Sequence, residues 1–252
     1  MPANVVLALF AFAPALALGS FLNVVVARIP ERRSLVSPRS ACTRCGHELA
    51  AWENVPLVSY LALRGRCRGC SAPIGVRYPL VELATALLIA ASFLRFGLTG
   101  RAFVAAFFCT VLVALSAIDA ERRILPDVIV LPSAVLVLGA QIALFPDRWL
   151  EWVLASLGAA LFLFVALLAY PKGMGLGDVK LALLLGAALG VHVTVGLMLG
   201  MVAAMLVGVV LIARHGAAAR KMKIPFGPFL AFGSIVALLW GERILDAYMT
   251  LY

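Results

Sequence analysis

The chain has 252 residues, of which 64% are hydrophobic and only 13% are charged, and its mean hydropathy of +1.07 excludes an ordinary soluble domain. The net charge is +9, from 21 basic and 12 acidic residues. No stretch interleaves basic and aromatic residues, so we expect no nucleic-acid partner and interpret the charge as a sign of membrane orientation.

Eight apolar runs follow one another along the chain. They cover residues 5–27, 79–96, 102–118, 126–145, 152–169, 179–190, 193–213 and 226–240. Since a helix needs about 20 apolar residues to cross a bilayer, these runs predict an all-α polytopic membrane protein with about eight transmembrane helices. No positively charged segment precedes the first run, so we expect it to remain a span rather than to be a cleaved signal peptide.

Residues 28–78 separate the first two runs and contain nine arginines. Because basic residues concentrate in cytoplasmic loops, this segment is predicted to be cytoplasmic. Alternation of the later spans then places both termini outside and 17 of the 21 basic residues inside. The sequence thus divides into a first transmembrane helix at 1–27, a cytoplasmic module at 28–78 and a helical membrane domain at 79–252.

The cytoplasmic module contains two C-x-x-C pairs, formed by Cys42, Cys45, Cys67 and Cys70. Two such pairs supply four thiolates for a tetrahedral zinc ion, and a reducing cytosol argues against the alternative of redox disulfides. Four thiolates leave no open position on the metal. We therefore expect a structural zinc ion in this module, which does not take part in catalysis.

Two acids, Asp119 and Asp178, stand at the ends of apolar runs on the predicted cytoplasmic side. Acids at the edge of a membrane span are costly and usually functional. We hypothesise that they converge as the acid pair of an intramembrane aspartyl protease. The alternative is that each is an ordinary helix-end residue, with Asp119 paired to the nearby Arg122 or Arg123. Asp127 follows Pro126, and its position is typical of a structural acid in the first turn of a helix.

The stretch around Asp178 is Gly-Met-Gly-Leu-Gly-Asp-Val-Lys, at residues 173–180. Glycine allows another chain to approach the backbone closely, so Gly175 and Gly177 are the expected contacts of an extended substrate. The run that follows, 179–190, has only 12 residues. It would span about 18 Å against a hydrocarbon core of roughly 30 Å. Either this helix is enclosed by protein, or the glycine-rich stretch itself dips into the membrane.

In the expected chemistry, one aspartate is ionised and activates a water that attacks the scissile carbonyl, and the other donates a proton to the carbonyl oxygen. Two close carboxylates share one proton because both cannot ionise cheaply. Two other classes of function fit the same residues. A proton-coupled transporter would use Asp119 and Asp178 as a relay, and a membrane scaffold would use only the zinc module.

Several stretches resemble one known family. Residues 175–178, Gly-Leu-Gly-Asp, match the G-x-G-D signature of the type IV prepilin peptidases, and residues 118–127 resemble the segment around that family's other catalytic aspartate. Further stretches of this chain resemble the N-terminal signatures of the same family: both C-x-x-C pairs and residues 19–25, 28–30, 54–57 and 77–83. The resemblance covers nearly the whole chain.

This resemblance implies an intramembrane aspartyl endopeptidase with Asp119 and Asp178 as the catalytic pair. Members of the family remove the basic leader of type IV prepilins or pseudopilins at the cytoplasmic face of the bacterial inner membrane. Members with the four-cysteine module commonly also methylate the new N-terminus, with S-adenosylmethionine as methyl donor. The resemblance therefore implies a bifunctional prepilin peptidase and N-methyltransferase, embedded in the lipid bilayer and acting in pilus assembly, protein secretion or DNA uptake.

Overall fold

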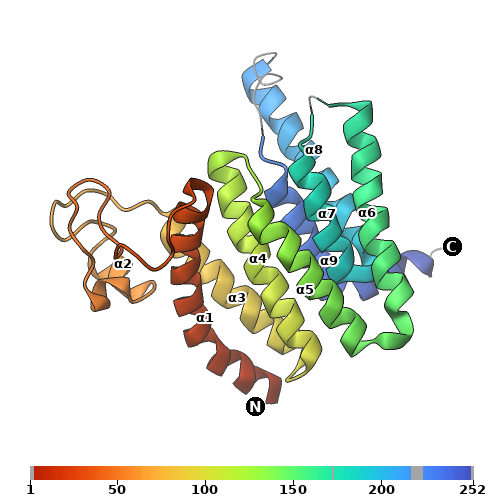
Figure 1. Ribbon diagram of the computed structural model, residues 1–252, viewed down its shortest axis with the longest axis horizontal. Helices are drawn as coiled ribbons and strands as arrows, with labels where there is room; N and C mark the ends of the chain where they lie inside the picture. Colours follow the sequence, from red (N-terminus) through yellow and green to blue (C-terminus); the bar gives the residue numbers. More distant parts are fainter. Residues whose placement is uncertain (1–2, 172, 217–223, 251–252) are drawn as a thin grey trace. The chain divides into compact units, whose positions relative to one another are not determined.

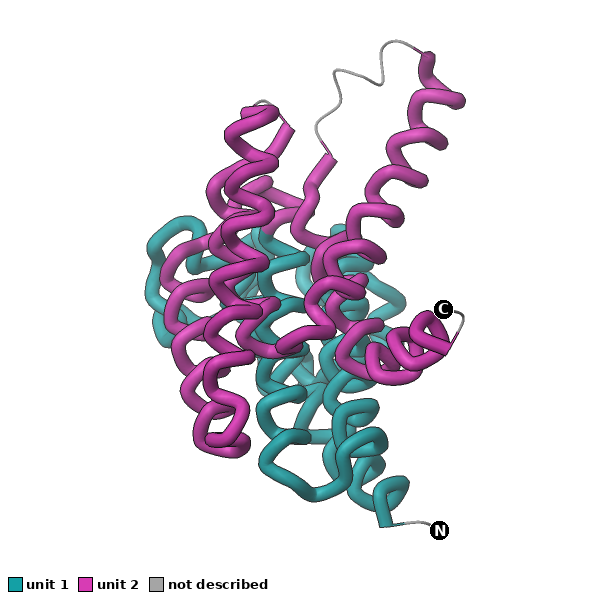
Figure 2. Tube along the Cα trace, turned by 90° about the vertical axis from the view of Figure 1, so that its right-hand side faces the viewer, with its two compact units in different colours: residues 1–118 teal, residues 119–252 magenta. Residues whose placement is uncertain are grey.

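The computed structural model describes residues 3–171, 173–216 and 224–250 (Figure 1). Within these ranges the chain forms nine α-helices and no β-strand, apart from two isolated bridges in the cysteine-containing segment. The chain divides into two compact units, residues 1–118 and 119–252 (Figure 2). The prediction of an all-α fold is confirmed.

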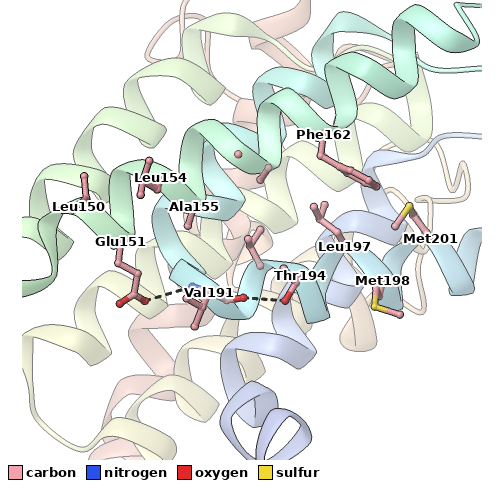
Figure 3. A pocket seen from close by; sticks show the side chains of 13 residues that line it. Leu150, Glu151, Leu154, Ala155, Phe162, Val191, Thr194, Leu197, Met198 and Met201 are labelled. Atoms are coloured by element: carbon pink, nitrogen blue, oxygen red, sulfur yellow. Dashed lines mark hydrogen bonds between the residues drawn. The ribbon is translucent and has the colours of Figure 1, made fainter. Parts of the chain in front are cut away.

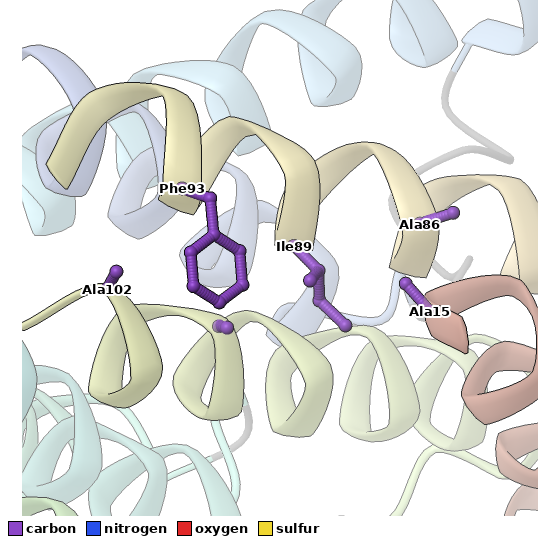
Figure 4. Close-up of a cluster of buried hydrophobic side chains, with 6 residues drawn as sticks. Ala15, Ala86, Ile89, Phe93 and Ala102 are labelled. Carbon is purple, nitrogen blue, oxygen red and sulfur yellow. The ribbon is translucent and has the colours of Figure 1, made fainter. Parts of the chain in front are cut away.

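The first unit contains α1 (Ala3–Arg28), α3 (Arg77–Phe96) and most of α4 (Gly100–Arg122). Between α1 and α3 lie the short α2 (Val58–Ala62), a 3-10 turn at Ala51–Asn54 and the loops that carry the cysteines. Helices α1 and α3 are antiparallel neighbours. Small and aromatic side chains pack where the helices of this unit meet (Figure 4): Ala15, Ala86, Ile89, Phe93, Ala102 and Ala106.

The second unit begins at Asp119, near the end of α4. It continues with α5 (Asp127–Leu144), α6 (Trp149–Ala169), α7 (Leu176–Leu189), α8 (Val193–His215) and α9 (Gly227–Met249). A short 3-10 turn, Gly190–His192, reverses the chain between α7 and α8. Glycines bring α8 and α9 into backbone contact, since a Cβ on Gly200 would lie 2.8 Å from the carbonyl oxygen of Phe229.

Seven segments of the described residues are long and apolar enough to cross a membrane, which confirms a multi-pass membrane protein. They are Ala3–Glu31, Arg77–Phe96, Gly100–Arg122, Asp127–Leu144, Pro146–Ala169, Leu176–His215 and Gly227–Met249. The 40-residue segment Leu176–His215 contains both α7 and α8, with the reversal at Gly190, whose φ is +57°. The eight predicted runs therefore correspond to eight helices of the described residues, of which α7 is the shortest.

Helix α4 extends beyond its predicted end. The apolar run ends at Ile118, but the helix continues to Arg122, because Ala120, Glu121 and Arg122 all favour helical geometry. It stops at Arg123, whose φ is +55°. Asp119, which directly follows the apolar run, therefore lies inside the last turn of the helix.

Helix α7 is short and almost fully enclosed. Its 14 residues span about 21 Å, and Leu181, Leu184 and Leu185 are at most 1% exposed. Polar side chains of its neighbours bind its backbone. Gln141 Nε2 donates to the Ala188 carbonyl at 2.9 Å, and Ser156 Oγ donates to the Leu183 carbonyl at 2.8 Å. Of the two predicted explanations for the short run, the structure supports enclosure by protein.

Candidate functional site

Asp119 lies in the last turn of α4 and is only 6% exposed. Its Oδ2 accepts a buried hydrogen bond of 2.9 Å from the backbone N–H of Gly227. Gly227 is the first residue of α9, so this N–H is one of the donors that a helix leaves without an internal partner. The positive end of α9 therefore holds the Asp119 carboxyl group in place.

Asp178 is the third residue of α7 and is 8% exposed. Its Oδ2 accepts a 3.1 Å hydrogen bond from the backbone N–H of Gly175, the residue that caps the helix. This contact is the return half of a capping box, in which the third residue of a helix reaches back to the capping residue. Asp178 thus belongs to a local turn, whereas Asp119 is fixed by a segment 108 residues away.

The structure brings the two predicted acids together within the second unit. The loop that follows Asp119 packs against the turn that carries Asp178. Close packing supports this arrangement. A Cβ on Gly177 would lie only 3.1 Å from Cβ of Leu125, in the loop between α4 and α5.

Each of the two carboxyl groups has one oxygen bound by a backbone N–H. An N–H can only donate, so the oxygen that it binds must be an acceptor and cannot carry a proton on that side. The second oxygen of Asp119 and that of Asp178 are left for water and for the exchange of a proton. This arrangement suits general acid–base chemistry, in which proton-transfer groups must be held at fixed positions.

An ion pair that local sequence analysis missed lies beside Asp178. Lys180 Nζ donates to both carboxylate oxygens of Asp127, at 2.8 and 2.7 Å, and so links the start of α5 to the first turns of α7. The predicted structural position of Asp127 at the start of a helix is confirmed. Its partner is 53 residues away, and no local pattern signals such a contact.

The two glycines that were expected to contact substrate differ in their surroundings. The nearest atoms to a Cβ on Gly175 would be 3.8 Å away, which is an ordinary contact distance. Gly177, in contrast, is closely covered by the side chain of Leu125. Of the two, Gly175 has the space that a substrate backbone would need.

An apolar groove of about 820 Å³ lies between α6 and α8 (Figure 3). Leu154, Phe162, Leu197 and Met198 are among its lining residues. Its lining on the side of α8 starts at Val191, just beyond the C-terminus of α7, whereas Asp178 is at the N-terminus of that helix. The groove therefore begins at the opposite end of α7 from the two acids.

The four predicted cysteine ligands cluster in the first unit. Their sulfur atoms all lie within 4.8 Å of one another, with Cys42 3.9 Å from Cys70 and Cys45 3.9 Å from Cys67. A tetrahedral zinc ion with bonds of about 2.3 Å requires sulfur atoms about 3.8 Å apart, so the cluster fits such an ion. All five cysteines of the chain are described, and each is a free thiol, contrary to the disulfide alternative.

The backbone around this cluster favours thiolates. Hydrogen bonds from the backbone N–H groups of Cys45 and Arg44 lower the pKa of Cys42 to about 6. Despite a hydrogen bond from the backbone N–H of His47, contacts with the other thiols raise the pKa of Cys45 to about 12, so the turn favours the metal-binding thiolate form at Cys42 and not at Cys45. Gly46, whose φ is +72°, allows the first turn to close.

A buried acid braces the cluster from the side. Glu53 Oε2 accepts a 2.7 Å bond from the Ala50 N–H and lies 3.3 Å from His47 Nε2. The bond from Ala50 and the contact with His47 lower the pKa of Glu53 below its usual value. His47 directly follows the first C-x-x-C turn, so Glu53 positions that turn. The sequence alone assigned Glu53 no role.

Together these features define a class: a polytopic membrane protein with two buried, backbone-fixed aspartates in one unit and a four-thiol cluster that could hold a metal ion in the other. A bundle of helices can pack without either feature. Buried acids in membrane helices usually mark a functional site, whereas a cluster of four thiols is typical of a structural metal site.

Comparison with known proteins then gives the family. Residues 14–96 match the bacterial peptidase A24 N-terminal domain, and residues 106–213 match the type IV leader peptidase family. The chain is 41% identical to a prepilin leader peptidase/N-methyltransferase of Pseudomonas aeruginosa, over 93% of this chain and 90% of that protein. It is 42% identical to the protein of that name from Pseudomonas putida, over 94% and 91% of the two chains.

A third relative of the same name, from Burkholderia pseudomallei, is 40% identical over 92% of this chain and 85% of its own. No solved structure matches the chain at a significant level. The chain belongs to the type IV leader peptidase family, and the family resemblance found in the sequence is confirmed.

Proposed function

We propose that this protein is a bifunctional membrane enzyme. It cleaves the basic leader of type IV prepilins or pseudopilins at the cytoplasmic face of the bacterial inner membrane and then N-methylates the new N-terminus. The names of the relatives support both activities. The observation that supports the proposal most directly is that Asp119 and Asp178 are both buried in the second unit, each held by a backbone N–H.

In the proposed cleavage, a water molecule binds between the unbonded oxygens of Asp119 and Asp178. The ionised acid takes a proton from this water, which attacks the scissile carbonyl, while the protonated acid donates to the carbonyl oxygen. The backbone bonds from Gly227 and Gly175 keep both groups from rotating away. Open space at Gly175 receives the extended substrate backbone, with Gly177 packed against Leu125 in the loop between α4 and α5.

The cytoplasmic position of the site rests on the distribution of basic residues. The predicted inner segments carry 17 of the 21 lysines and arginines. Lys172 and three of the basic residues of the 214–223 segment lie outside the described residues. A basic prepilin leader would then remain in the cytosol while the apolar segment of the substrate enters the bilayer.

Zinc is the metal that best suits the thiol cluster. Cys42, Cys45, Cys67 and Cys70 would hold it, and bound zinc would supply structural stability to a segment with little regular structure. For the second activity, S-adenosylmethionine is the proposed methyl donor, as the N-methyltransferase names of the relatives suggest.

The experiment that tests the proposal is cell-free cleavage of candidate prepilins by the purified protein in lipid nanodiscs. Mass spectrometry of the product should show loss of the leader and, with S-adenosylmethionine present, the addition of one methyl group. A purified protein that leaves every candidate intact would contradict the peptidase assignment. Normal processing by variants that lack either acid would favour a scaffold, and acid-dependent proton flux without cleavage would favour a transporter.

A further inference from the structure

Three sequence segments that the cleavage site does not use meet between α1 and α3. They are residues 19–23, 54–57 and 78–82. A Cβ on Gly19 would lie 2.6 Å from Cα of Glu82, so the two helices touch at this level. One turn further along α1, Asn23 Nδ2 donates to the Tyr78 carbonyl at 3.1 Å. The third segment contributes the Leu57 N–H, which donates to Glu82 Oε2 at 2.9 Å.

The polar atoms at this junction are mainly hydrogen-bond acceptors. Glu82 is 8% exposed, and the described residues offer it two neutral donors, the Leu57 N–H and the Ser20 hydroxyl. Asn23 is 5% exposed, and its Oδ1 has no hydrogen-bond partner among the described residues. Burying a carboxyl group costs free energy of folding, and so does burying an amide oxygen that has no hydrogen-bond partner. A structural link between the helices would need neither.

The Glu82 carboxyl group and the free amide oxygen of Asn23 belong to facing stretches of the two helices. Side chains on a helix lean toward its N-terminus, so Asn23 on α1 leans toward the level of Gly19. In the antiparallel α3, Glu82 lies opposite Gly19 and leans toward the level of Tyr78, whose carbonyl Asn23 binds. The two acceptor groups therefore lean toward adjacent levels of the same junction.

A primary ammonium group is the natural ligand of such a site, because it carries a positive charge and three N–H donors. Leader cleavage creates one such group, the α-amine of the mature pilin. We propose that Glu82 and Asn23 bind this α-amino group and that Glu82 accepts its proton for methyl transfer. This inference rests on the proposed function and locates its second reaction. The match to the peptidase A24 N-terminal domain, residues 14–96, contains the whole junction and neither aspartate of the cleavage site.

The chemical step balances with a sulfonium methyl donor. The ammonium group gives one proton to the Glu82 carboxylate and becomes a neutral amine. Its nitrogen lone pair then attacks the donor methyl carbon, the carbon–sulfur bond breaks, and the bonding electrons remain on sulfur as a neutral thioether. The product is a secondary ammonium, and the proton on Glu82 later passes to solvent. Asn23 Oδ1 accepts a hydrogen bond from the amine and orients its lone pair.

The binding half of the proposal can be tested without a methyl donor. Fluorescence anisotropy in nanodiscs would compare a labelled pilin N-terminal peptide with a free α-amine and the same peptide N-acetylated. The wild-type protein should prefer the free amine about tenfold, the effect expected of a charge-assisted hydrogen bond. Glu82→Gln should lose this preference, because it keeps the shape of the side chain without its charge. Asn4→Leu is the matched control, because Asn4 donates to the Leu94 carbonyl at the far end of the same helix pair. Equal preference in Glu82→Gln and wild type would overturn the proposal.

The catalytic half uses a pre-cleaved peptide and labelled S-adenosylmethionine. Glu82→Gln should reduce methyl transfer about 100-fold or more, as expected for loss of a general base, and Asn23→Leu should mainly raise the KM for the peptide. Leader cleavage by the same preparations serves as the measure of folding. Its rate should change less than about twofold, as expected for a substitution outside the cleavage site. Methylation by Glu82→Gln at the wild-type rate refutes this site alone. An equal loss of both reactions also refutes it, because the residue is then structural. Failure of the wild-type protein to transfer label refutes the proposed methyltransferase activity and the site with it.

Discussion

The contact between Gly227 and Asp119 gives a sharp test of the cleavage site. In Gly227→Ala the new Cβ would lie 2.8 Å from Oδ2 of Asp119 and 3.3 Å from its Cγ, closer than such atoms pack. Either the carboxyl group rotates away or the start of α9 shifts. In both cases the 2.9 Å hydrogen bond is lost or lengthened. A hydrogen bond to a charged acceptor contributes about 1.5–3 kcal/mol, which corresponds to a decrease in kcat of about 10- to 150-fold.

The assay is the initial rate of leader cleavage from a purified prepilin at saturating concentration, so that kcat is separated from KM. Gly139→Ala is the control, because Gly139 is also helical and a Cβ there meets no atom within 4 Å. The variant should keep the wild-type rate. If Gly227→Ala cleaves as fast as Gly139→Ala, the bond from Gly227 does not position Asp119 for catalysis, and the account of how the first acid is held is wrong.

Three further predictions follow from the geometry. Asp119→Asn and Asp178→Asn should each abolish cleavage while the protein stays inserted, and both variants should still methylate a pre-cleaved peptide. If either variant cleaves at the wild-type rate, the residue that it replaces is not part of the catalytic pair. Asp127→Asn should keep the cleavage rate within about fivefold of wild type, because the ion pair of Asp127 with Lys180 is partly exposed and such pairs contribute about 1 kcal/mol or less. If Asp127→Asn is inactive and Asp119→Asn is active, Asp127 and not Asp119 belongs to the catalytic pair. The reduced protein should contain one zinc ion per chain by metal analysis, and its removal by a chelator should impair methylation more than cleavage; equal impairment, or absence of zinc, would count against this role.

Much of the architecture follows from local sequence. Hydropathy located each membrane helix, since the bilayer demands long apolar runs. The spacing of the C-x-x-C pairs anticipated the cluster of Cys42, Cys45, Cys67 and Cys70, because each turn holds two thiols at metal-binding distance. Hydropathy was less accurate for the end of α4. It marks where apolar residues end, whereas the helix ends where backbone geometry changes, at Arg123.

The contacts that position the site were beyond local analysis. Gly227 reaches Asp119 across 108 residues, and Lys180 reaches Asp127 across 53. Such contacts depend on which helices become neighbours, and hydropathy carries no information on that choice. The free oxygen of Asn23 is hidden for the same reason, since a sequence does not show which hydrogen bonds a buried amide completes. The catalytic roles of Asp119 and Asp178 remain a prediction.

The shortness of α7 has a consequence for the biogenesis of the protein. Its 14 residues are too few to be recognised as an independent span during synthesis. The helix would therefore enter the membrane together with α8, as a hairpin, after α5 and α6 have formed the walls against which it packs. Asp119 acquires its backbone donor from Gly227, in α9, which is made after both α4 and α7. A nascent chain or one that lacks α9 thus holds both acids without a finished site, and proteolytic activity appears only when α9 is in place.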